Sequence, residues 1–325
     1  MLFRSLAYRE LKAAIQANRA RSGSAVVIDV TTGEVLAMVN QPTFNPNDRE
    51  QLKPAGYKNR AATDLVEPGS SIKPFVVAAG LASGLYNASS VIDTSPGMIK
   101  VGLKVIEDHH NLGAVDLATV LAKSSNVGMT HIALNLGPER IYSTLSKLGF
   151  GQVTTSGYPG ESAGLLTNYS RWRPITTATV AYGYGLSVTP LQLAHAYATL
   201  GAGGISRPIS FVKVDHPVPG ERVLPEQVSR DVVHMLESVV SNIGTGKRAS
   251  IAGYRVAGKT GTAWKSSIGG YSTNRYLAVF AGVAPATNPR LATVVVIDEP
   301  SAGLYYGGDV SAPVFAGIMG GALRL

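Results

Sequence analysis

The feature that most constrains this fold is the placement of β-rich segments near both ends of the chain. Residues 24–30 and 34–39 are joined by Thr31-Thr32-Gly33, which predicts an N-terminal hairpin. Three further β-rich runs lie in the last third of the chain, at residues 254–264, 275–284 and 291–298. We therefore expect an α/β fold with an antiparallel sheet that is completed by both chain ends.

Apolar residues in the middle of the chain recur at the spacing of one helix face. The segments with this pattern are residues 114–148, 174–201 and 228–240, with a closing helix at about 311–323 and an amphipathic segment at 5–20. Residues 149–173 are rich in Gly, Ser, Thr and Pro and are predicted to form a loop. We expect helices that flank the sheet and an inserted, mainly helical subdomain. The expected division is an N-terminal helical segment, residues 1–22, and one domain, residues 23–325.

The composition is that of a globular enzyme and excludes several kinds of chemistry. With 325 residues, 45% of them hydrophobic, the chain can form one large domain or two ordinary ones. It has no cysteine, which excludes disulfides, thiolate zinc sites and cysteine nucleophiles. Its six histidines show no metal-ligand spacing, so we expect neither metal nor cofactor. The net charge of +8 fits contact with an anionic surface or a solvated basic surface.

The sequence shows no membrane span. No apolar run approaches the roughly 18 residues that a span needs. We expect no signal peptide, because residues 1–4 lead directly into the amphipathic segment. We expect the chain as given to be soluble, whereas a longer parent could have carried an anchor.

The run from Glu67 to Pro74 places a nucleophile beside a base. It reads Glu-Pro-Gly-Ser-Ser-Ile-Lys-Pro, so Ser70 and Lys73 are three residues apart. A serine hydroxyl is a weak nucleophile until an adjacent base takes its proton. If residues 71–83 are helical, both side chains lie on one helix face. The helix N-terminus also favours negative charge on the attacking oxygen, by roughly 0.3–1 kcal/mol.

Three other strings resemble catalytic motifs but lie in the wrong context. Ser210 and Lys213 repeat the spacing in a predicted strand, where residues three apart point to opposite faces. Residues 160–164 match the Gly-x-Ser-x-Gly nucleophile elbow of α/β-hydrolases, which needs a strand before it and a helix after it. Here loop is predicted on both sides. A phosphate-loop string at residues 253–260 continues as a strand instead of opening a helix. We assign no chemistry to these strings.

Two further motifs carry polar groups that suit a binding cleft. Ser124 and Asn126, in Lys-Ser-Ser-Asn, are able to point into one cavity, and the alternative is a helix N-cap. In the run 258–262, Lys259 is flanked by glycines and hydroxyls, which suits a strand that lines a site and binds a carboxylate. The alternative is an edge strand with a solvated lysine.

In this order, Ser70-x-x-Lys73, Ser124-x-Asn126 and Lys259-Thr260-Gly261 resemble the signature of penicillin-binding proteins and class A β-lactamases. Further runs narrow the resemblance to the transpeptidase domain of division-specific class B penicillin-binding proteins: residues 60–64, 67–69, 182–189, 298–300 and 305–308. The resemblance covers about residues 20–323. Members of that family normally begin with a cytoplasmic segment, a membrane helix and a non-catalytic pedestal. This chain resembles the catalytic domain alone.

The resemblance implies a serine D,D-transpeptidase that cross-links peptidoglycan stem peptides during septal cell-wall synthesis. Ser70 would form the acyl-enzyme, and Lys73 would accept its proton. Ser124 would pass a proton to the leaving D-Ala nitrogen with Lys259 nearby, and Asn126 would orient the substrate amide. β-Lactams would stop the enzyme at the acyl stage.

The resemblance also implies the remaining parts of the site. Thr260, Gly261 and Thr262 would bind the terminal carboxylate region, and Tyr182 and Tyr184 would line the cleft. The backbone N–H groups of Ser70 and Thr262 would form the oxyanion hole.

The implied partners are donor and acceptor stem peptides, β-lactam antibiotics and, in the full-length parent, glycosyl-polymerising and division proteins, with no nucleic acid. The implied location is the periplasmic face of the bacterial inner membrane. Two alternatives stay open. One is a hydrolase, either a D,D-carboxypeptidase or a β-lactamase, although no acidic residue lies in a motif suited to deacylation. The other is a non-catalytic penicillin-recognition or scaffold domain.

Overall fold

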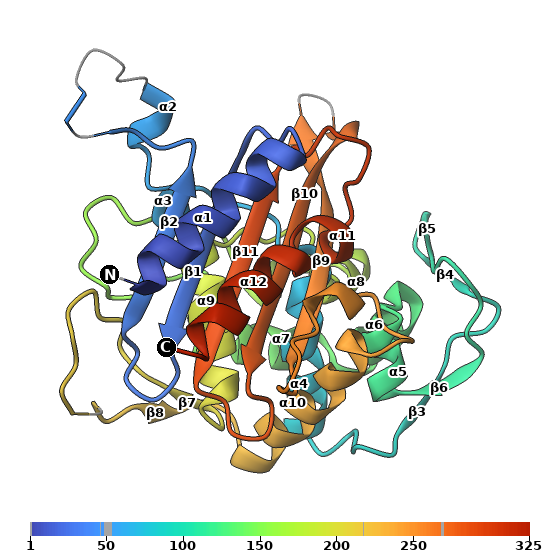
Figure 1. Ribbon diagram of the computed structural model, residues 1–325. Coiled ribbons are helices and arrows are strands. Elements are labelled where there is room, and N and C mark those ends of the chain that lie inside the picture. The colour runs from blue at the N-terminus through green and yellow to red at the C-terminus, as the bar shows by residue number, and fades with distance from the viewer. Residues whose placement is uncertain (1, 46, 49–53, 217, 268–269) are drawn as a thin grey trace.

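A five-stranded antiparallel sheet runs through the centre of the molecule (Figure 1). The computed structural model describes residues 2–45, 47–48, 54–216, 218–267 and 270–325. In the order β2-β1-β11-β10-β9, the strands are Val35–Gln41, Ser22–Asp29, Leu291–Asp298, Gly270–Ala284 and Ala257–Ser267. The N-terminal hairpin thus pairs with strands from the end of the chain, which confirms the predicted sheet.

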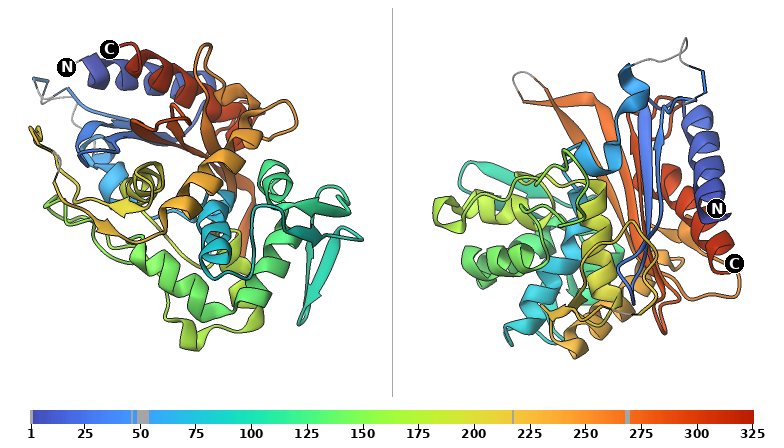
Figure 2. Two further views of the ribbon diagram at one scale, coloured as in Figure 1. Left: turned by 90° about the horizontal axis from the view of Figure 1, so that it is seen from below. Right: turned by 90° about the vertical axis from the view of Figure 1, so that its left-hand side faces the viewer.

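The sheet is buried on both faces, and alternate residues of its central strands enter two different cores. In β1, Val26 and Ile28 pack toward the helical subdomain, whereas Ala25 and Val27 pack on the opposite side. Figure 2 shows this layering, with helices on either side of the sheet.

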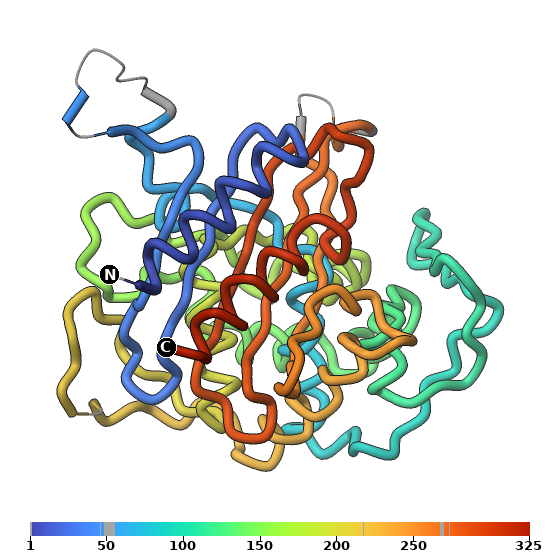
Figure 3. The backbone as a smooth tube through the Cα atoms, in the orientation of Figure 1, coloured from blue at the N-terminus to red at the C-terminus, as the bar shows by residue number. Residues whose placement is uncertain are grey.

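Two helices from the chain ends cover one face of the sheet. These are α1 (Leu2–Ala17), which packs on β2, and α12 (Ala312–Ala322), which packs on β10 and β11. The two helices also contact each other, and the backbone trace in Figure 3 shows them side by side. The division of the chain at residue 22 stays a prediction. Among the described residues, no helix combines the length and apolar character needed to cross a membrane.

The chain between β2 and β9 covers the other face and is mainly helical, as predicted. Its longer helices are α4 (Lys73–Ala82), α5 (Leu117–Ala122), α6 (Asn126–Leu136), α7 (Pro138–Lys147), α8 (Pro174–Ala181), α9 (Pro190–Gly201) and α10 (Glu226–Val240). The short helices are α2 (Pro54–Tyr57), α3 (Arg60–Thr63) and, after β11, α11 (Gly307–Val310). Three 3₁₀ turns are η1 (Gly69–Ile72), η2 (Tyr169–Arg171) and η3 (Lys247–Ala249).

The helical layer also contains small two-stranded sheets. They pair β3 (Val91–Asp93) with β6 (Ala114–Asp116), β4 (Met98–Val101) with β5 (Lys104–Glu107), and β7 (Ile205–Ser206) with β8 (Glu221–Arg222). The strand predicted around Ser210 is wrong, because this residue makes only an isolated bridge to Glu34. Its hydroxyl bonds the carbonyl of Val212, and Lys213 pairs with Asp215.

Candidate active site

The nucleophile candidate lies on a tight turn that enters α4. Ser70 belongs to the 3₁₀ turn η1 and not to an α-helix, and its side chain is half-buried. The N–H of Lys73 bonds the carbonyl oxygen of Ser70, so the two residues are one turn apart, as predicted. Gly69 begins the turn with a φ of +53°, a left-handed value that glycine adopts without strain.

Two glycines from distant segments hold this turn against its neighbours. A Cβ atom at Gly183 would lie 1.9 Å from the carbonyl oxygen of Gly69, and one at Gly261 would lie 2.7 Å from that of Pro68. The N–H of Gly69 also bonds the carbonyl of Gly183 at 3.1 Å. Only glycine permits these approaches, so the turn before Ser70 is fixed by β9 and by the 183–185 loop.

The base candidate, Lys73, is fully buried and reaches the loop that precedes α6. Its Nζ donates to the carbonyl oxygen of Ser124 at 2.6 Å and to Oδ1 of Asn126 at 2.8 Å. It also lies 3.2 Å from the Ser124 hydroxyl and from the Ser125 carbonyl oxygen. The first two motifs therefore meet at this nitrogen.

The hydroxyl of Ser124 lies between two lysines. Nζ of Lys259, which is also fully buried, approaches it at 3.0 Å from β9. Ser124 adopts a φ of +58°, which is uncommon for a serine. The N-cap alternative holds for its neighbour, since Ser125 caps α6 by accepting from the N–H of Gly128. All three sequence motifs thus converge on one oxygen.

Burial lowers the pKa of both lysines. For Lys259 it brings the pKa to about 7. For Lys73 burial is the largest cause, the positive charge of Lys259 lowers the pKa further, and Asp108 opposes the change. Two cations buried around one hydroxyl repel each other, so the site favours a neutral amine near pH 7.

Strand β9 presents a free edge to the cleft, because it is the last strand of the sheet. Oγ1 of Thr262 accepts from the N–H of Gly307 at 3.0 Å, and Oγ1 of Thr260 lies 2.7 Å from that of Thr245. The N–H of Trp264 bonds the hydroxyl of Tyr184 and therefore points outward. Because N–H groups two apart in a strand share one edge, that of Thr262 points outward too.

Three tyrosines form a contiguous cluster beside this strand. The rings of Tyr182 and Tyr184 lie 6.0 Å apart and those of Tyr184 and Tyr271 lie 5.3 Å apart, both edge to face. The Tyr271 hydroxyl donates to Glu67 Oε1 at 2.9 Å. Burial raises the pKa of Tyr182 to about 12, so its hydroxyl stays neutral. Of the two tyrosines predicted from sequence, Tyr184 therefore lies against the strand that carries Lys259, and Tyr182 packs on Tyr184.

Residues 23–320 match the penicillin-binding protein transpeptidase domain. This chain belongs to that family. It is 51% identical over 320 residues to the peptidoglycan D,D-transpeptidase FtsI of Escherichia coli K12, covering 98% of this chain and 54% of that protein. It is 43% identical over 321 residues to the probable peptidoglycan D,D-transpeptidase PenA of Neisseria meningitidis serogroup A, covering 99% and 55%. The chain thus spans about half the length of these curated relatives.

A solved structure supports the same assignment. The apo transpeptidase domain of penicillin-binding protein 3 from Burkholderia pseudomallei superposes with a TM-score of 0.91 at 40% identity. The match covers 99% of this chain and 93% of that structure. The mixed α/β fold with an antiparallel sheet is therefore that of a penicillin-binding transpeptidase domain.

The structure of this transpeptidase domain adds residues that sequence reasoning missed. The carboxylate of Asp108 accepts from the backbone N–H of Asn126 at 2.5 Å and of Val127 at 3.1 Å, and from the Ser125 hydroxyl. Thr245 links α5 to β9, because its N–H bonds the carbonyl of Ala122 and its hydroxyl bonds that of Thr260. Neither residue belongs to a motif, and only the fold brings them to the site.

The rejected strings do not form the motifs that they resemble. The hydroxyl of Ser162 bonds the carbonyl of Thr63, in a loop. Residues 257–267 form β9 and not the strand-to-helix turn of a phosphate loop. Within the described ranges, no cluster of three or more His, Asp or Glu side chains is arranged to hold a metal ion.

Proposed function

We propose that this domain is a peptidoglycan D,D-transpeptidase that works through an acyl-enzyme at Ser70. The observation that carries the proposal is the Ser124 hydroxyl held between two buried lysines, beside the turn that presents Ser70. A neutral amine is available there near pH 7, and general-base help of this kind accelerates a reaction by roughly 10²–10⁴-fold.

Acylation follows from these positions. Oγ of Ser70 attacks the carbonyl carbon of the penultimate D-Ala while neutral Lys73 takes the hydroxyl proton. The bond to the terminal D-Ala breaks, and Ser124, between Lys73 and Lys259, passes a proton to the leaving nitrogen. An amine of a second stem peptide then attacks the ester carbonyl. The new C–N bond forms, the bond to Oγ breaks, and a proton returns to Ser70.

The remaining residues hold the donor peptide. Asn126 accepts from Lys73 through Oδ1, which leaves its amide N–H₂ to orient the substrate amide. The hydroxyls of Thr260 and Thr262, with Lys259, bind the terminal carboxylate. The N–H groups of Ser70 and Thr262 stabilise the oxyanion, where losing one donor costs on the order of 10²–10³-fold in related chemistry.

The other named residues shape the cleft. Gly261 lets β9 approach the Ser70 turn, and Tyr182 and Tyr184 line the cleft beside the strand. These roles are supported by the contacts described above.

The contacts of Glu161, an acidic residue in the loop at residues 149–173, favour transfer over hydrolysis. Its Oε1 accepts from the N–H and hydroxyl of Thr154 at 2.7 and 2.6 Å, and its Oε2 accepts from Ser156. These bonds hold the carboxylate within its own loop, so it is not free to act as the base that activates water for deacylation.

The experiment is intact-mass measurement after incubation with benzylpenicillin. A transpeptidase gives a one-to-one adduct that persists for many minutes. A β-lactamase-like hydrolase would instead release the drug within seconds, and an idle scaffold would give no adduct. Ser70→Ala is expected to abolish the adduct.

In the full-length protein we place this domain at the periplasmic face of the inner membrane, acting in septal synthesis with glycosyl-polymerising and division proteins. The relation to FtsI supports this context. We also propose residues 1–22 as a segment that precedes the domain 23–325. The substrates of the transpeptidase domain are donor and acceptor stem peptides, and β-lactams are its inhibitors.

A further inference from the structure

The pairing of β9 with β10 is interrupted just beyond the candidate active site. The ladder between the two strands is in register from Ala257 to Trp264. It then breaks at Lys265, which faces a bulge formed by residues 272–275 of β10. The break lies three residues beyond Thr262. Backbone pairing therefore does not fix β9 at Lys265.

Packing against the helical layer does not replace this pairing. Ala263 and Lys265 share one face of the sheet, because residues two apart in a strand point to the same side. Ala263 is buried in the core on this face, whereas Lys265 borders a polar cavity of about 410 Å³. The cavity separates the end of β9 from residues 64–67, the segment that leads to Ser70. The lysine thus lies beside a hollow and not within a packed core.

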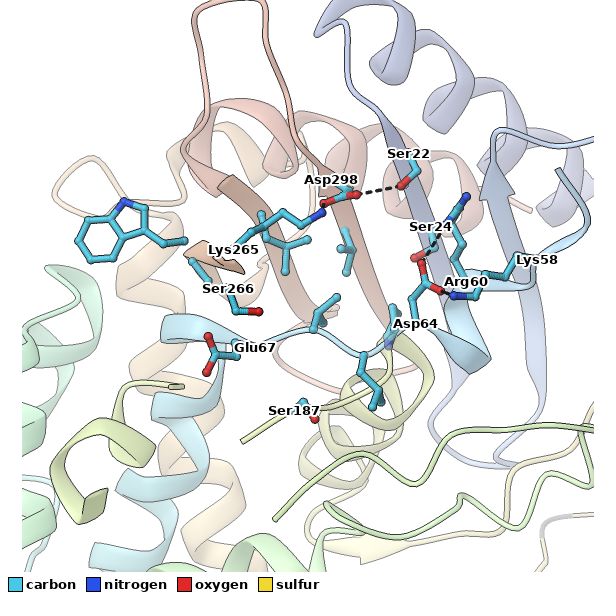
Figure 4. Close-up of a pocket in the computed structure, with 18 residues that line it drawn as sticks. Ser22, Ser24, Lys58, Arg60, Asp64, Glu67, Ser187, Lys265, Ser266 and Asp298 are labelled. Atoms are coloured by element: carbon cyan, nitrogen blue, oxygen red, sulfur yellow. Dashed lines mark hydrogen bonds and ion pairs between the residues drawn. The ribbon is translucent and has the colours of Figure 1, made fainter. Parts of the chain in front are cut away.

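The side chain of Lys265 joins β9 to the end of β11. Its Nζ donates to Oδ1 of Asp298 at 2.6 Å and to Oε1 of Glu299 at 2.7 Å. Figure 4 shows the lysine directed at Asp298, whose other oxygen accepts from the Ser22 hydroxyl at the start of β1. Because β10 lies between β9 and β11, these contacts span a whole strand. They tie the end of β9 to the middle of the sheet.

Glu299 makes its contact from a strained backbone conformation. Its φ of +49° lies in the left-handed region, which is uncommon for a residue that has a Cβ atom. A glycine would adopt this backbone without strain. The carboxylate pairs with Arg21 at 3.0 Å as well as with Lys265. These ion pairs are what a glutamate adds at a position where the backbone alone favours glycine.

The edge of β9 beside Lys265 is where an extended donor peptide would continue. The N–H groups of Thr262 and Trp264 point outward along this edge. A donor that is held by its carboxylate at Thr260 and Thr262 passes Trp264, the neighbour of Lys265. A strand end that is already fixed there binds the donor without a further loss of conformational freedom.

We propose that Lys265 is a positioning residue for the donor peptide. Its ion pairs with Asp298 and Glu299 hold β9 beyond Thr262, so the strand edge is preformed for the part of the donor that precedes the scissile bond. This inference rests on the proposed function and adds to it a residue outside the three motifs. Lys265 acts through the backbone of β9 and not on the reacting atoms.

The probes are benzylpenicillin and 6-aminopenicillanic acid. Both present the same β-lactam carbonyl and carboxylate, but only benzylpenicillin has an acyl side chain where the donor continues along β9. The ratio of their second-order acylation constants therefore measures the contribution of the strand edge beyond Thr262. A loss of folded protein, or of the basicity of Lys73, lowers both constants alike and leaves the ratio unchanged.

Lys265→Met keeps the apolar stem of the side chain and removes both ion pairs. We expect it to lower the ratio by about 10-fold, within the roughly 10²-fold that a misplacement of about 1 Å can cost. Lys265→Arg keeps a cation that is able to reach both carboxylates, and it is expected to keep most of the ratio. The matched control is Lys58→Met, which removes a lysine of the same cavity that pairs with Asp64. This control is expected to keep the wild-type ratio.

Glu299→Gly is the second variant, in case Lys265→Met does not fold. It removes one of the two carboxylates and relaxes the left-handed backbone. We expect the ratio to fall while the unfolding midpoint stays close to that of the wild type, because relief of the strain offsets the lost ion pairs. A purely structural role would instead leave the ratio unchanged.

Three results would overturn the proposal: a wild-type ratio in folded Lys265→Met or in Glu299→Gly, an equal fall in the control Lys58→Met, or an equal fall in Lys265→Arg. Benzylpenicillin acting on the wild type tests the proposed function separately. If it fails to acylate the wild type, the proposed function is wrong. If it acylates normally and the substitutions leave the ratio unchanged, only the role of Lys265 is wrong.

Discussion

Lys73 and Lys259 donate to the same hydroxyl oxygen, that of Ser124, at 3.2 and 3.0 Å. Both side chains are fully buried, although they come from segments 186 residues apart in the chain (259 minus 73). Keeping two ammonium groups there is costly because neither is well hydrated and each repels the other. The arrangement therefore supplies a neutral amine at a pH where a free lysine is charged.

Acylation is expected to rise with pH. The pKa of Lys73 is lowered from its ordinary value, so its neutral form appears as pH increases through the lowered value. We therefore expect the rate with benzylpenicillin to increase as pH rises, at pH values well below the ordinary pKa of a lysine, and then to level off. Stopped-flow or quenched-flow acylation across pH 5.5–9 measures this profile. A flat profile, or a rise only near pH 10, would contradict the lowered lysine pKa values.

Ser124→Ala is expected to reduce the acylation rate by about 10²-fold or more while leaving the fold intact, because it removes only the shared hydroxyl. Ser125→Ala is the matched control. It removes the N-cap of α6 and is expected to cost about 1 kcal/mol of stability. Acylation kinetics and the unfolding midpoint, measured on both variants, separate the two roles. Equal kinetic losses would mean that position 124 is only structural.

Asp108→Asn tests the anchor of the 124–126 loop. The carboxylate accepts two backbone N–H groups, and its charge raises the pKa of Lys73. Removing that charge lowers the pKa, so the ascending limb of the pH profile is expected to move to lower pH. The plateau rate is expected to fall because the loop is less firmly held. A limb displaced to higher pH would refute this electrostatic role.

Gly183→Ala tests the packing behind the nucleophile turn. The new Cβ would lie 1.9 Å from the carbonyl of Gly69, and the φ of +93° is strained for alanine. Gly157→Ala provides the control, with a φ of +73° but open space around the new atom. We expect the control to lose about 1–2 kcal/mol of stability and to keep its acylation rate. Gly183→Ala is expected to lose more stability and most of its acylation; equal behaviour of the two variants would contradict this packing.

The sheet and the three motifs were predictable because they depend on local patterns. β-rich runs, helical periodicity and the spacing of Ser70 and Lys73 are all read within short windows. The parts that were missed depend on long-range contacts. Asp108 lies 16 residues before Ser124, with β6 and α5 between them, and no spacing rule connects the two residues. The segment around Ser210 has β-type residues but lacks a neighbouring strand over most of its length, so its local preference did not decide its structure.

The orientation of the Glu67 side chain likewise could not be predicted from the sequence. Its place three residues before Ser70 was visible, but its contacts with Gly185 and Tyr271 come from distant segments. Local sequence patterns predicted the three motifs, and the tertiary fold determines which polar groups surround them.

Locating the covalent adduct tests the role of Ser70 as the nucleophile. Wild-type protein is labelled with benzylpenicillin, digested and mapped by tandem mass spectrometry. We expect one modified peptide with the penicilloyl group on Ser70, and no labelling in Ser70→Ala. An adduct on Ser124, Ser162 or another residue, or one that persists in the alanine variant, would contradict the assignment of Ser70 as the nucleophile.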